Sequence, residues 1–403
     1  MTAPELSVRL VRRGYEGLRA NVSQLGRDGS YLARMLGRRA LVVWGAEGAR
    51  VFYDGTLVQR SGAVPPPLAR LLFGKGAVHG LDGEAHISRK AIFLTVLEPA
   101  RVGELVDDVC RALMQRVRGW PSRGDLSVFT ELVEVYGSSV MRWAGIELSD
   151  EESRRRSHEL ARIVDGFGGA GYAYVRGAVA RRNSNRWAAE LIGQVRRGDL
   201  HPPRDSALWI LAMGDGAELD DATAGVELLN ILRPTVAVAW LGTFAALALD
   251  SFPEWRPRLI DDVEGVRHAF AQEVRRTAPF APALAARVRA RTERFGVRLE
   301  PGDFLVLDVL STNHDPARWP DPVRFDPTRF MDEDPGPYDL VAQGGGDPRT
   351  GHKCPGEPLA TAMLRETAGC LAAVDYVVVS DPSYDPRRIP TLPTDGLILR
   401  ANR

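Results

Sequence analysis

The feature that most constrains the fold of this chain is an apolar stretch, Leu228–Leu249, with Arg233 and Pro234 inside it. Apolar residues lie on nearly every side of the helix that this pattern predicts, which is typical of a helix running through a protein core. The part without charge or proline, Thr235–Leu249, is shorter than the about 20 residues that a membrane-spanning helix needs. We therefore expect a buried core helix and no membrane span.

Composition and charge narrow the class of protein. The chain has 403 residues, with 52 Lys plus Arg against 52 Asp plus Glu, so its formal charge is zero, whereas a general nucleic-acid binder needs a basic surface. Apolar residues at 44% and charged residues at 26% are typical of a globular protein. The three cysteines are an odd number, which fits a reducing compartment, and the polar, arginine-rich segment Met1–Arg27 is not a signal peptide. We expect a cytoplasmic protein without a nucleic-acid partner.

Hydrophobic periodicity predicts helices in most of the first half, with two early strands at Ala40–Trp44 and Ala49–Asp54. Helical patterns follow over Leu208–Leu249 and Glu264–Pro279. The pattern then alternates over Phe295–Val309 around Glu-Pro-Gly-Asp, which predicts two strands joined as a hairpin.

A long irregular segment, Thr312–Gly351, is rich in Pro, Asp and Gly, and such segments in compact domains are usually functional. A helix is predicted at about Glu357–Val374, and short strands at Tyr376–Val379 and Gly396–Leu399. Together these patterns predict one domain over residues 1–403, mainly α with small β-sheets.

The irregular segment leads to Cys354 through a glycine-rich loop. Gly346 and Gly351 are among the glycines that let this backbone approach a flat or bulky group closely. Pro355 leads into the predicted helix, whose N-terminal dipole favours a thiolate. A thiolate in this position suits a haem iron held through sulfur.

Two other interpretations of this cysteine stay open at this point. A lone cysteine is usually a buried and inert residue. His352 and Cys354 also form half of a zinc site, although no second pair at ligand spacing is found in the sequence. Cys110 and Cys370 lie in helical patterns and are expected only to pack.

The cysteine loop resembles the haem-binding loop of the cytochrome P-450 superfamily, Phe-x-x-Gly-x-Arg-x-Cys-x-Gly. It departs from that form because Gln343-Gly-Gly-Gly replaces the aromatic start and Gly351-His-Lys precedes Cys354. This departure resembles one branch, the bacterial fatty-acid peroxygenases, whose loop is Gln-Gly-Gly-Gly…Gly-His-Arg-Cys-Pro-Gly-Glu. The resemblance implies the cytochrome P-450 fold, with haem b between the long core helix and the loop and with Cys354 as the iron ligand.

The superfamily also has a Glu-x-x-Arg pair on a core helix. That pattern recurs in this chain, but Glu273 and Arg276 stand out because they precede the predicted strands, the segment Trp319–Phe330 and the cysteine loop, in the family's order. The resemblance implies that a second arginine, Arg329, joins this pair. A buried carboxylate between two guanidinium groups would hold the irregular segment in place, which is a structural role.

Arg233 and Pro234 are unfavourable residues for a core helix, since an unpaired buried charge costs several kcal/mol or more and an internal proline costs about 3 kcal/mol. One explanation is that Arg233 ends one helix and Pro234 begins the next. The other is that Arg233 binds an anionic group of the substrate, for which a guanidinium suits a carboxylate. No acid precedes Thr235, where ordinary members of the superfamily keep a proton-delivering acid and alcohol, and the peroxygenase branch has this Arg-Pro pair.

The resemblance implies a substrate-assisted mechanism. Arg233 would hold the fatty-acid carboxylate near the iron, and this carboxylate would act as base and acid while the O–O bond of hydrogen peroxide breaks. The thiolate favours that cleavage, and no reductase would be needed. Arg233, Pro234 and His79 are the candidate catalytic residues.

The segment Leu72–Gly80 resembles the substrate-pocket segment of the same branch, so Phe73 and His79 are candidates for substrate binding beside Arg233. Many hydroxylases of the branch have Gln at the position of His79, and an alkene-forming decarboxylase has His. A histidine can supply a proton or electron where an amide cannot. His79 therefore favours some decarboxylation to a terminal alkene beside hydroxylation at the α or β carbon.

Haem propionates need cations, and candidates are His86, Arg60 and Lys353, together with Arg89 and Lys90. A solvated basic face is the alternative for the residues at helical spacing. The sequence as a whole predicts a hydrogen-peroxide-dependent fatty-acid peroxygenase without an obligatory redox partner. The alternatives are a conventional monooxygenase that needs ferredoxin and reductase, and a non-catalytic haem-binding protein.

Overall fold

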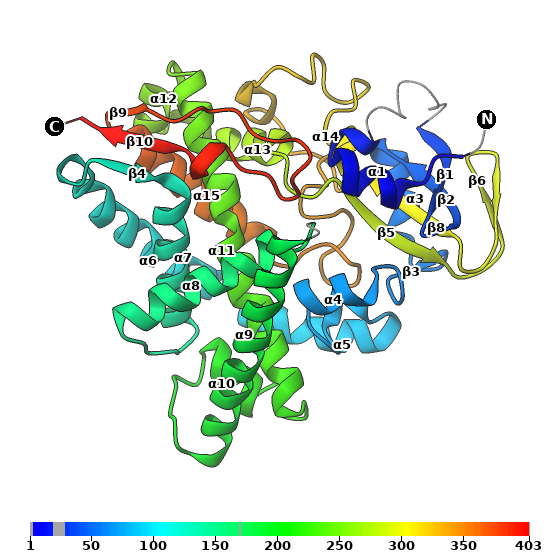
Figure 1. Cartoon of the computed structure of the whole chain (residues 1–403), viewed down its shortest axis with the longest axis horizontal. Helices are drawn as coiled ribbons and strands as arrows, with labels where there is room; N and C mark the ends of the chain where they lie inside the picture. The colour runs from blue at the N-terminus through cyan, green and yellow to red at the C-terminus, as the bar shows by residue number, and fades with distance from the viewer. Residues whose placement is uncertain (1–2, 19–28, 169–170, 403) are drawn as a thin grey trace.

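The computed structural model describes residues 3–18, 29–168 and 171–402, and the predicted polar segment Met1–Arg27 lies partly outside them. Helices form the larger part of the molecule, and a smaller part at the other end of the long axis contains the five-stranded sheet (Figure 1). The helices are α1 (Leu6–Arg13), α3 (Gly45–Phe52), α4 (Pro66–Leu72), α5 (Gly83–Val96), α6 (Pro99–Arg118), α7 (Val128–Trp143), α8 (Asp150–Asp165), α9 (Tyr172–Arg197), α10 (Ala207–Met213), α11 (Asp221–Ser251), α12 (Trp255–Asp261), α13 (Val266–Thr277), α14 (Val309–Asn313) and α15 (Glu357–Ala372). The mainly α class is confirmed.

Three small sheets accompany the helices, as predicted. The five-stranded sheet has the order β1-β2-β8-β5-β3, the three-stranded sheet the order β4-β10-β9, and β6 pairs with β7. The strands are β1 (Ser30–Met35), β2 (Arg38–Val43), β3 (Val58–Gln59), β4 (Asp125–Ser127), β5 (Ala283–Val288), β6 (Thr292–Arg294), β7 (Val297–Leu299), β8 (Phe304–Asp308), β9 (Tyr376–Val378) and β10 (Ile398–Ala401). Short 3₁₀ helices lie at Val78–Gly80, Trp120–Ser122, Val263–Gly265, Pro327–Phe330 and Thr394–Gly396.

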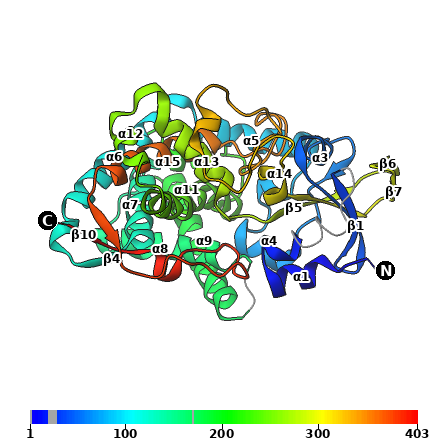
Figure 2. The same ribbon diagram turned by 90° about the horizontal axis from the view of Figure 1, so that it is seen from above.

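The predicted core helix is α11, which packs against α7, α8, α9, α13 and α15. Figure 2 shows it in the middle of the helical part, with other helices around it. The single helical stretch predicted from Leu208 is in fact two helices, because the chain turns at Gly214 and Gly216 before Asp220 caps the start of α11 by accepting from the N–H of Thr223 at 2.9 Å.

Helix α11 continues unbroken through Arg233 and Pro234, so the interpretation of a helix end at this pair is wrong. Because the helix is continuous, it is long and apolar enough to cross a membrane by length and composition, but 89% of its most apolar window is buried inside the protein. It is the core helix that the apolar pattern predicted.

Two predicted β elements differ in the structure. The segment Ala49–Asp54 is not a strand: its first four residues form the end of helix α3, where Gly48, Ala49, Val51 and Phe52 are buried, and Tyr53 and Asp54 follow the helix. The hairpin prediction over Phe295–Val309 is also wrong in its pairing, because β7 pairs with β6 whereas β8 pairs with β2 and β5. All five residues of β8 are buried, and a strand buried on both faces is stable between two neighbours.

The irregular segment is confirmed between α14 and α15, where the described chain contains a single short 3₁₀ helix. Helix α13 confirms the helix predicted before the strands, and α15 confirms the helix after Cys354. The cysteine therefore lies between a long irregular segment and a regular helix, beside the centre of the helical part.

Candidate functional site

Cys354 lies at the end of the glycine-rich loop, three residues before α15 begins. Its N–H donates to the carbonyl of Gln343 at 3.0 Å, which closes the loop. Burial raises the pKa of the Cys354 thiol, although the N–H of Gly356 donates to the sulfur and lowers it. A thiol with a raised pKa becomes a thiolate when a metal ion binds it, so the sulfur suits a metal ligand better than a free nucleophile.

The glycines of this loop allow it to fold closely against aromatic rings. Gly344 has a φ of +92°, and a Cβ added to it would lie 2.7 Å from the hydroxyl of Tyr53. Gly346 has a φ of +85°, and its added Cβ would lie 3.3 Å from the hydroxyl of Tyr338. Gly351 is needed for a tight turn, since its Cβ would lie 2.9 Å from the carbonyl of Asp347. The loop thus forms a cradle in which side chains have no room on the aromatic side.

A lysine and an arginine from distant helices hold the cysteine loop. Nζ of Lys90 donates to the carbonyls of Gly351 and, at 2.6 Å, Lys353. Nε of Arg275 donates to the side-chain oxygen of Gln343 at 2.8 Å, and the same guanidinium forms an ion pair with Glu357. The loop is therefore tied to α5 and α13 as well as to its own helix.

Lys353 and Lys90, two of the candidate cations for haem propionates, are thus engaged elsewhere. Nζ of Lys353 lies 2.6 Å from the carboxylate of Glu357. Lys90 is only 3% exposed and bonds the loop carbonyls, so it belongs to no solvated basic face. Arg89 also points elsewhere, because it forms an ion pair with Glu227 at 2.7 Å.

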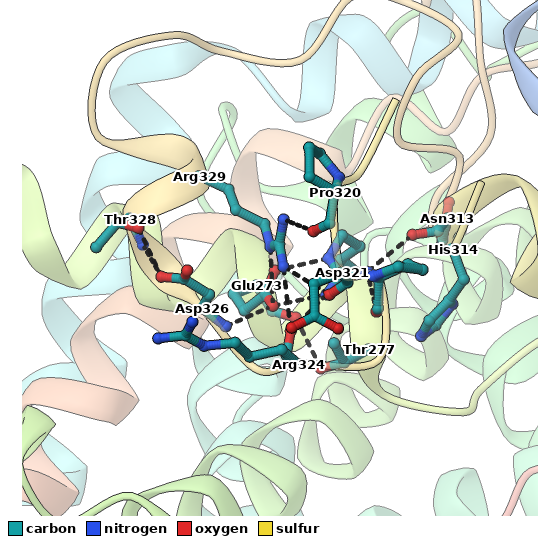
Figure 3. A network of polar contacts seen from close by, with 12 residues as sticks. Glu273, Thr277, Asn313, His314, Pro320, Asp321, Arg324, Asp326, Thr328 and Arg329 are labelled. Carbon is teal, nitrogen blue, oxygen red and sulfur yellow. Dashed lines mark hydrogen bonds and ion pairs between the residues drawn. The ribbon is translucent and has the colours of Figure 1, made fainter. Parts of the chain in front are cut away.

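The structure brings Glu273, Arg276 and Arg329 together. Figure 3 shows Arg329 beside Glu273. Glu273 and Arg276 form two bonds of 2.7 Å between fully buried side chains, and Nε of Arg329 lies 3.8 Å from Glu273. The remaining N–H groups of the two arginines donate to main-chain carbonyls of the irregular segment: Asn313, Pro320, Asp321, Pro322 and Arg324. The network fixes a segment that has almost no regular hydrogen bonds of its own.

Arg233 is a buried residue of α11, with 6% of its surface exposed. Its Nη2 donates to Oδ1 of Asn230 at 3.2 Å, and its Nε has no hydrogen-bond partner among the described residues. Burial and, to a smaller extent, the charge of Arg181 lower the pKa of Arg233 to about 9, against the opposing effect of Cys354. No carboxylate of the described chain pairs with this guanidinium, so an incoming anion would be its natural partner.

His79 and Phe73 lie against each other, with ring centroids 4.2 Å apart and an angle of 13° between the planes. The His79 side chain keeps accessible surface, yet burial lowers its pKa to about 3. The charges of Arg233 and His86 also lower this pKa, so both side chains lie near enough to the His79 ring to act on it.

Arg60 and His86 remain as candidates for haem propionates. The Arg60 guanidinium lies over the Phe52 ring at 4.0 Å, and its Nη1 has no hydrogen-bond partner in the part of the chain that the structure describes. The His86 ring is 3.9 Å from the ring of His352, and both line a cavity of about 350 Å³ with Arg60. A guanidinium whose buried Nη1 has no partner among the described residues, beside two imidazoles, suits a pair of carboxylates.

Sequence reasoning missed four residues of this site. Arg275 ties the cysteine loop, while Glu227, Asn230 and Arg181 bond the segment around Phe73 and His79. A signal for two of them existed, because Glu227 and Asn230 precede Arg233 at intervals of three residues in an otherwise apolar helix. No pattern singles out Arg181 or Arg275, which lie among many other arginines.

The zinc interpretation finds no support in the ligand geometry. No group of three or more His, Cys, Asp and Glu residues suited to a metal ion is found in residues 3–18, 29–168 and 171–402. His352 instead contacts His86 and lies 3.5 Å from Asp82. The loop cradle, the Cys354 sulfur and the Arg60 guanidinium with its free Nη1 fit a flat group that carries a metal and two carboxylates, which describes haem.

Comparison with known proteins agrees with this description. The cytochrome P-450 family model matches residues 267–371, from α13 to α15. Among curated proteins, the putative cytochrome P-450 138 of Mycobacterium tuberculosis is 24% identical over 364 residues, which are 85% of this chain and 79% of the relative. Cytochrome P-450 CYP199A2 of Rhodopseudomonas palustris is 28% identical over 251 residues, 62% of this chain and 59% of the relative.

Solved structures are similar over almost the whole chain. Cytochrome P-450SP alpha (CYP152B1) in complex with (R)-ibuprophen has a TM-score of 0.93 and 35% identity, covering 99% of this chain and 98% of that one. A variant of cytochrome P-450 OleT in complex with arachidonic acid has a TM-score of 0.93 and 30% identity, with the same coverage. Ligand-free cytochrome P-450 OleT has a TM-score of 0.94 and 30% identity, with coverage of 99% and 97%. The predicted fold is confirmed.

Proposed function

Because the chain belongs to the cytochrome P-450 superfamily, in the branch that its cysteine loop and its Arg233-Pro234 pair resemble, we propose that it is a hydrogen-peroxide-dependent fatty-acid peroxygenase. The protein is an oxidoreductase with haem b as its cofactor and a cysteine thiolate as the axial ligand. Its proposed reactions are hydroxylation of a fatty acid at the α or β carbon and decarboxylation to a terminal alkene. The proposal includes a cytoplasmic location.

One observation carries this proposal. The Arg233 guanidinium is buried in a core helix, its Nε has no partner among residues 3–18, 29–168 and 171–402, and its neighbour Arg181 adds charge of the same sign. A buried cation without an anion is costly, and a carboxylate that enters with the substrate removes that cost. Two of the similar structures are complexes with carboxylic acids, (R)-ibuprophen and arachidonic acid, which is consistent with this substrate class.

Cys354 is the residue that would hold the haem iron, and Arg60 with His86 would hold the propionates. When bound, haem supplies an oxidising iron centre whose thiolate ligand favours cleavage of an O–O bond. The hydrogen bonds from Lys90 and Arg275 keep the cysteine loop in the conformation that presents the sulfur.

Arg233 binds and orients the substrate in this proposal. Its free Nε would donate to one oxygen of the carboxylate, which fixes the α and β carbons at a constant distance from the arginine. The carboxylate then takes and returns the proton that other family members move with an acid and an alcohol. The hydroxyl of Thr235 donates to the carbonyl of Ile231 at 3.0 Å, and Pro234 has no N–H, so neither residue offers a proton here.

His79 would influence the fate of the oxidised substrate. It is neutral, since its pKa is lowered to about 3, and a neutral imidazole can donate a proton from one nitrogen and accept one at the other. Its ring stacks on Phe73, and the charge of Arg233 acts on it. This arrangement supports decarboxylation as a reaction beside hydroxylation.

The deciding experiment supplies the haem-loaded protein with saturated fatty acids and either hydrogen peroxide alone or a ferredoxin, its reductase and NADPH. We expect turnover with peroxide alone. Turnover with the redox chain only would indicate a conventional monooxygenase, and no turnover with either would indicate a non-catalytic haem protein.

Variants of Arg233 test the role of the carboxylate. Arg233→Ala should lose about 100-fold or more in kcat/KM for fatty acids, because a buried charged partner is removed. Arg156→Ala is the matched control, since Arg156 is also a buried arginine but lies on α8 with its bonds to Glu152 and Glu159. Wild-type turnover of acids by Arg233→Ala would contradict the substrate-assisted mechanism.

A further inference from the structure

Three polar residues form a stripe along α11: Glu227, Asn230 and Arg233. They follow one another at intervals of three residues, so successive side chains of the stripe are neighbours on the helix surface. Glu227 is fully buried, and Asn230 and Arg233 are 5% and 6% exposed. Buried polar groups of this kind need defined partners, and these three partner one another.

The direction of each hydrogen bond in the stripe is set by Glu227. Its carboxylate has no hydrogen to donate, so it accepts from Nδ2 of Asn230 at 2.9 Å. This hydrogen bond turns the NH₂ group of Asn230 toward Glu227 and its oxygen toward Arg233. Oδ1 of Asn230 accepts from Nη2 of Arg233 at 3.2 Å. An amide turned by 180° would present an NH₂ group to the arginine, and two donors would then face each other.

The same residues hold the segment that carries Phe73 and His79. Oε1 of Glu227 accepts from the N–H of Val78 at 2.9 Å, next to His79. Nδ2 of Asn230 also donates to the carbonyl of Phe73 at 3.0 Å. The Glu227 carboxylate thus bonds both to Val78, which precedes His79, and to the Asn230 amide, which accepts from Arg233.

Arg89 and Arg181 make further contacts with Glu227 and with the segment that carries Phe73 and His79. Nη1 of Arg89 lies 2.7 Å from Oε1 of Glu227, and this ion pair opposes the rise that burial causes in the pKa of the Glu227 carboxyl. Nη2 of Arg181 donates to the carbonyl of Phe73 at 2.8 Å. Gly74 has a φ of +93°, and an added Cβ would lie 2.1 Å from Nη2 of Arg181 and 2.7 Å from Val226, so the backbone here fits closely between α9 and α11.

We propose that Glu227 is a positioning residue that couples Arg233 to the segment of Phe73 and His79. It acts through the orientation of Asn230 and through the N–H of Val78. A substrate carboxylate bound to Arg233 would therefore stand at a fixed place relative to His79, and this place selects between hydroxylation and decarboxylation. The inference rests on the proposed function, because it needs an acid bound at Arg233.

The test replaces the carboxylate by an amide of the same size. Glu227→Gln must turn its NH₂ group toward Asn230 if its oxygen keeps the bonds to Val78 and Arg89, and Asn230 then has to turn its own NH₂ group toward Arg233. We expect KM for fatty acids to rise about tenfold or more, the loss typical of a hydrogen bond to a charged group, with a much smaller change in kcat. The ratio of alkene to hydroxy acid should change as well.

The matched control is Glu131→Gln. Glu131 is a buried glutamate on α7 that bonds Arg116, Arg123 and the Trp120 ring N–H, away from the site. Both variants should lower the melting temperature, but only Glu227→Gln should move KM and the product ratio. Equal effects of the two variants on KM would contradict the positioning role and leave a purely structural one.

A second variant, Asn230→Ala, keeps the inference testable even where Glu227→Gln loads haem poorly, and combining the two variants completes a double-mutant cycle. Asn230→Ala removes the link to Arg233 while Glu227 keeps Val78 and Arg89, so it should raise KM by itself. In the double variant the two effects should not add, because both break one chain of bonds. Additive effects would contradict the coupling. If the wild type bound no fatty acid at all, the proposed function would fail. If the wild type bound fatty acids and the variants had the same KM and product ratio, only the role of Glu227 would be contradicted.

Discussion

The ring of His79 lies nearly parallel to the ring of Phe73, with the centroids 4.2 Å apart and 13° between the planes. Stacking restricts the imidazole to one orientation, and the bonds to the Phe73 carbonyl and to the Val78 N–H fix the backbone on both sides of it. The histidine is therefore presented by a rigid segment, and its chemistry depends on a geometry that conservative variants can keep.

The first prediction concerns the product of the reaction. His79→Gln keeps a polar side chain that can lie over Phe73, but an amide cannot exchange a proton as an imidazole does. We expect the fraction of terminal alkene among the products to fall severalfold, while total consumption of the fatty acid changes less. Gas chromatography with mass detection of the two product classes measures this ratio. An unchanged ratio would remove His79 from the proposed chemistry.

The second prediction concerns pH. Burial lowers the pKa of His79 from its ordinary value of 6.5 to about 3, so the neutral form is present at every pH well above 3. The product ratio of the wild type should therefore stay constant between about pH 5 and pH 8, where an ordinary histidine changes its charge. A transition in the ratio near pH 6.5 would show that His79 titrates normally.

The third prediction concerns the buried carboxylate of Glu273. Glu273→Gln leaves Arg276 fully buried without its anion, and breaking one side of such a pair typically costs about 3–5 kcal/mol in the free energy of unfolding. Chemical denaturation followed by circular dichroism measures this loss. Glu104→Gln, on an exposed carboxylate that pairs with Arg101, is the control and should change the free energy by less than about 1 kcal/mol.

The fourth prediction concerns Lys90. Lys90→Met fills a similar volume but cannot donate to the carbonyls of Gly351 and Lys353, so the cysteine loop loses two tethers. We expect a lower haem content after purification and faster transfer of haem to apomyoglobin, with about 1–3 kcal/mol less stability. Lys75→Met, on an exposed lysine, should behave like the wild type. Normal haem retention in the Lys90 variant would mean that the loop holds its shape without this lysine.

The sequence by itself determined the features that depend on local spacing. Apolar residues on every side of Leu228–Leu249 predicted the core helix, and the glycine loop before Cys354 predicted the cofactor ligand. Glu273 and Arg276 could be singled out among the recurring Glu-x-x-Arg patterns by their order before the strands and the cysteine loop, and residues three apart meet on a helix. Such features can be predicted from the sequence because the residues that form them are close along the chain.

Only the tertiary structure decided which distant groups meet. The strand β8 pairs with β2 and β5 and not with its neighbour β7, because a strand buried on both faces needs partners on both sides. Lys90 donates to the cysteine loop and Arg89 pairs with Glu227, whereas the sequence predicted that both bind haem propionates or lie on a solvated basic face. A long charged side chain has many possible partners within its reach, and the packing of helices far apart in sequence selects one of them. The orientation of Asn230, and with it the position of Arg233, follows from the same packing.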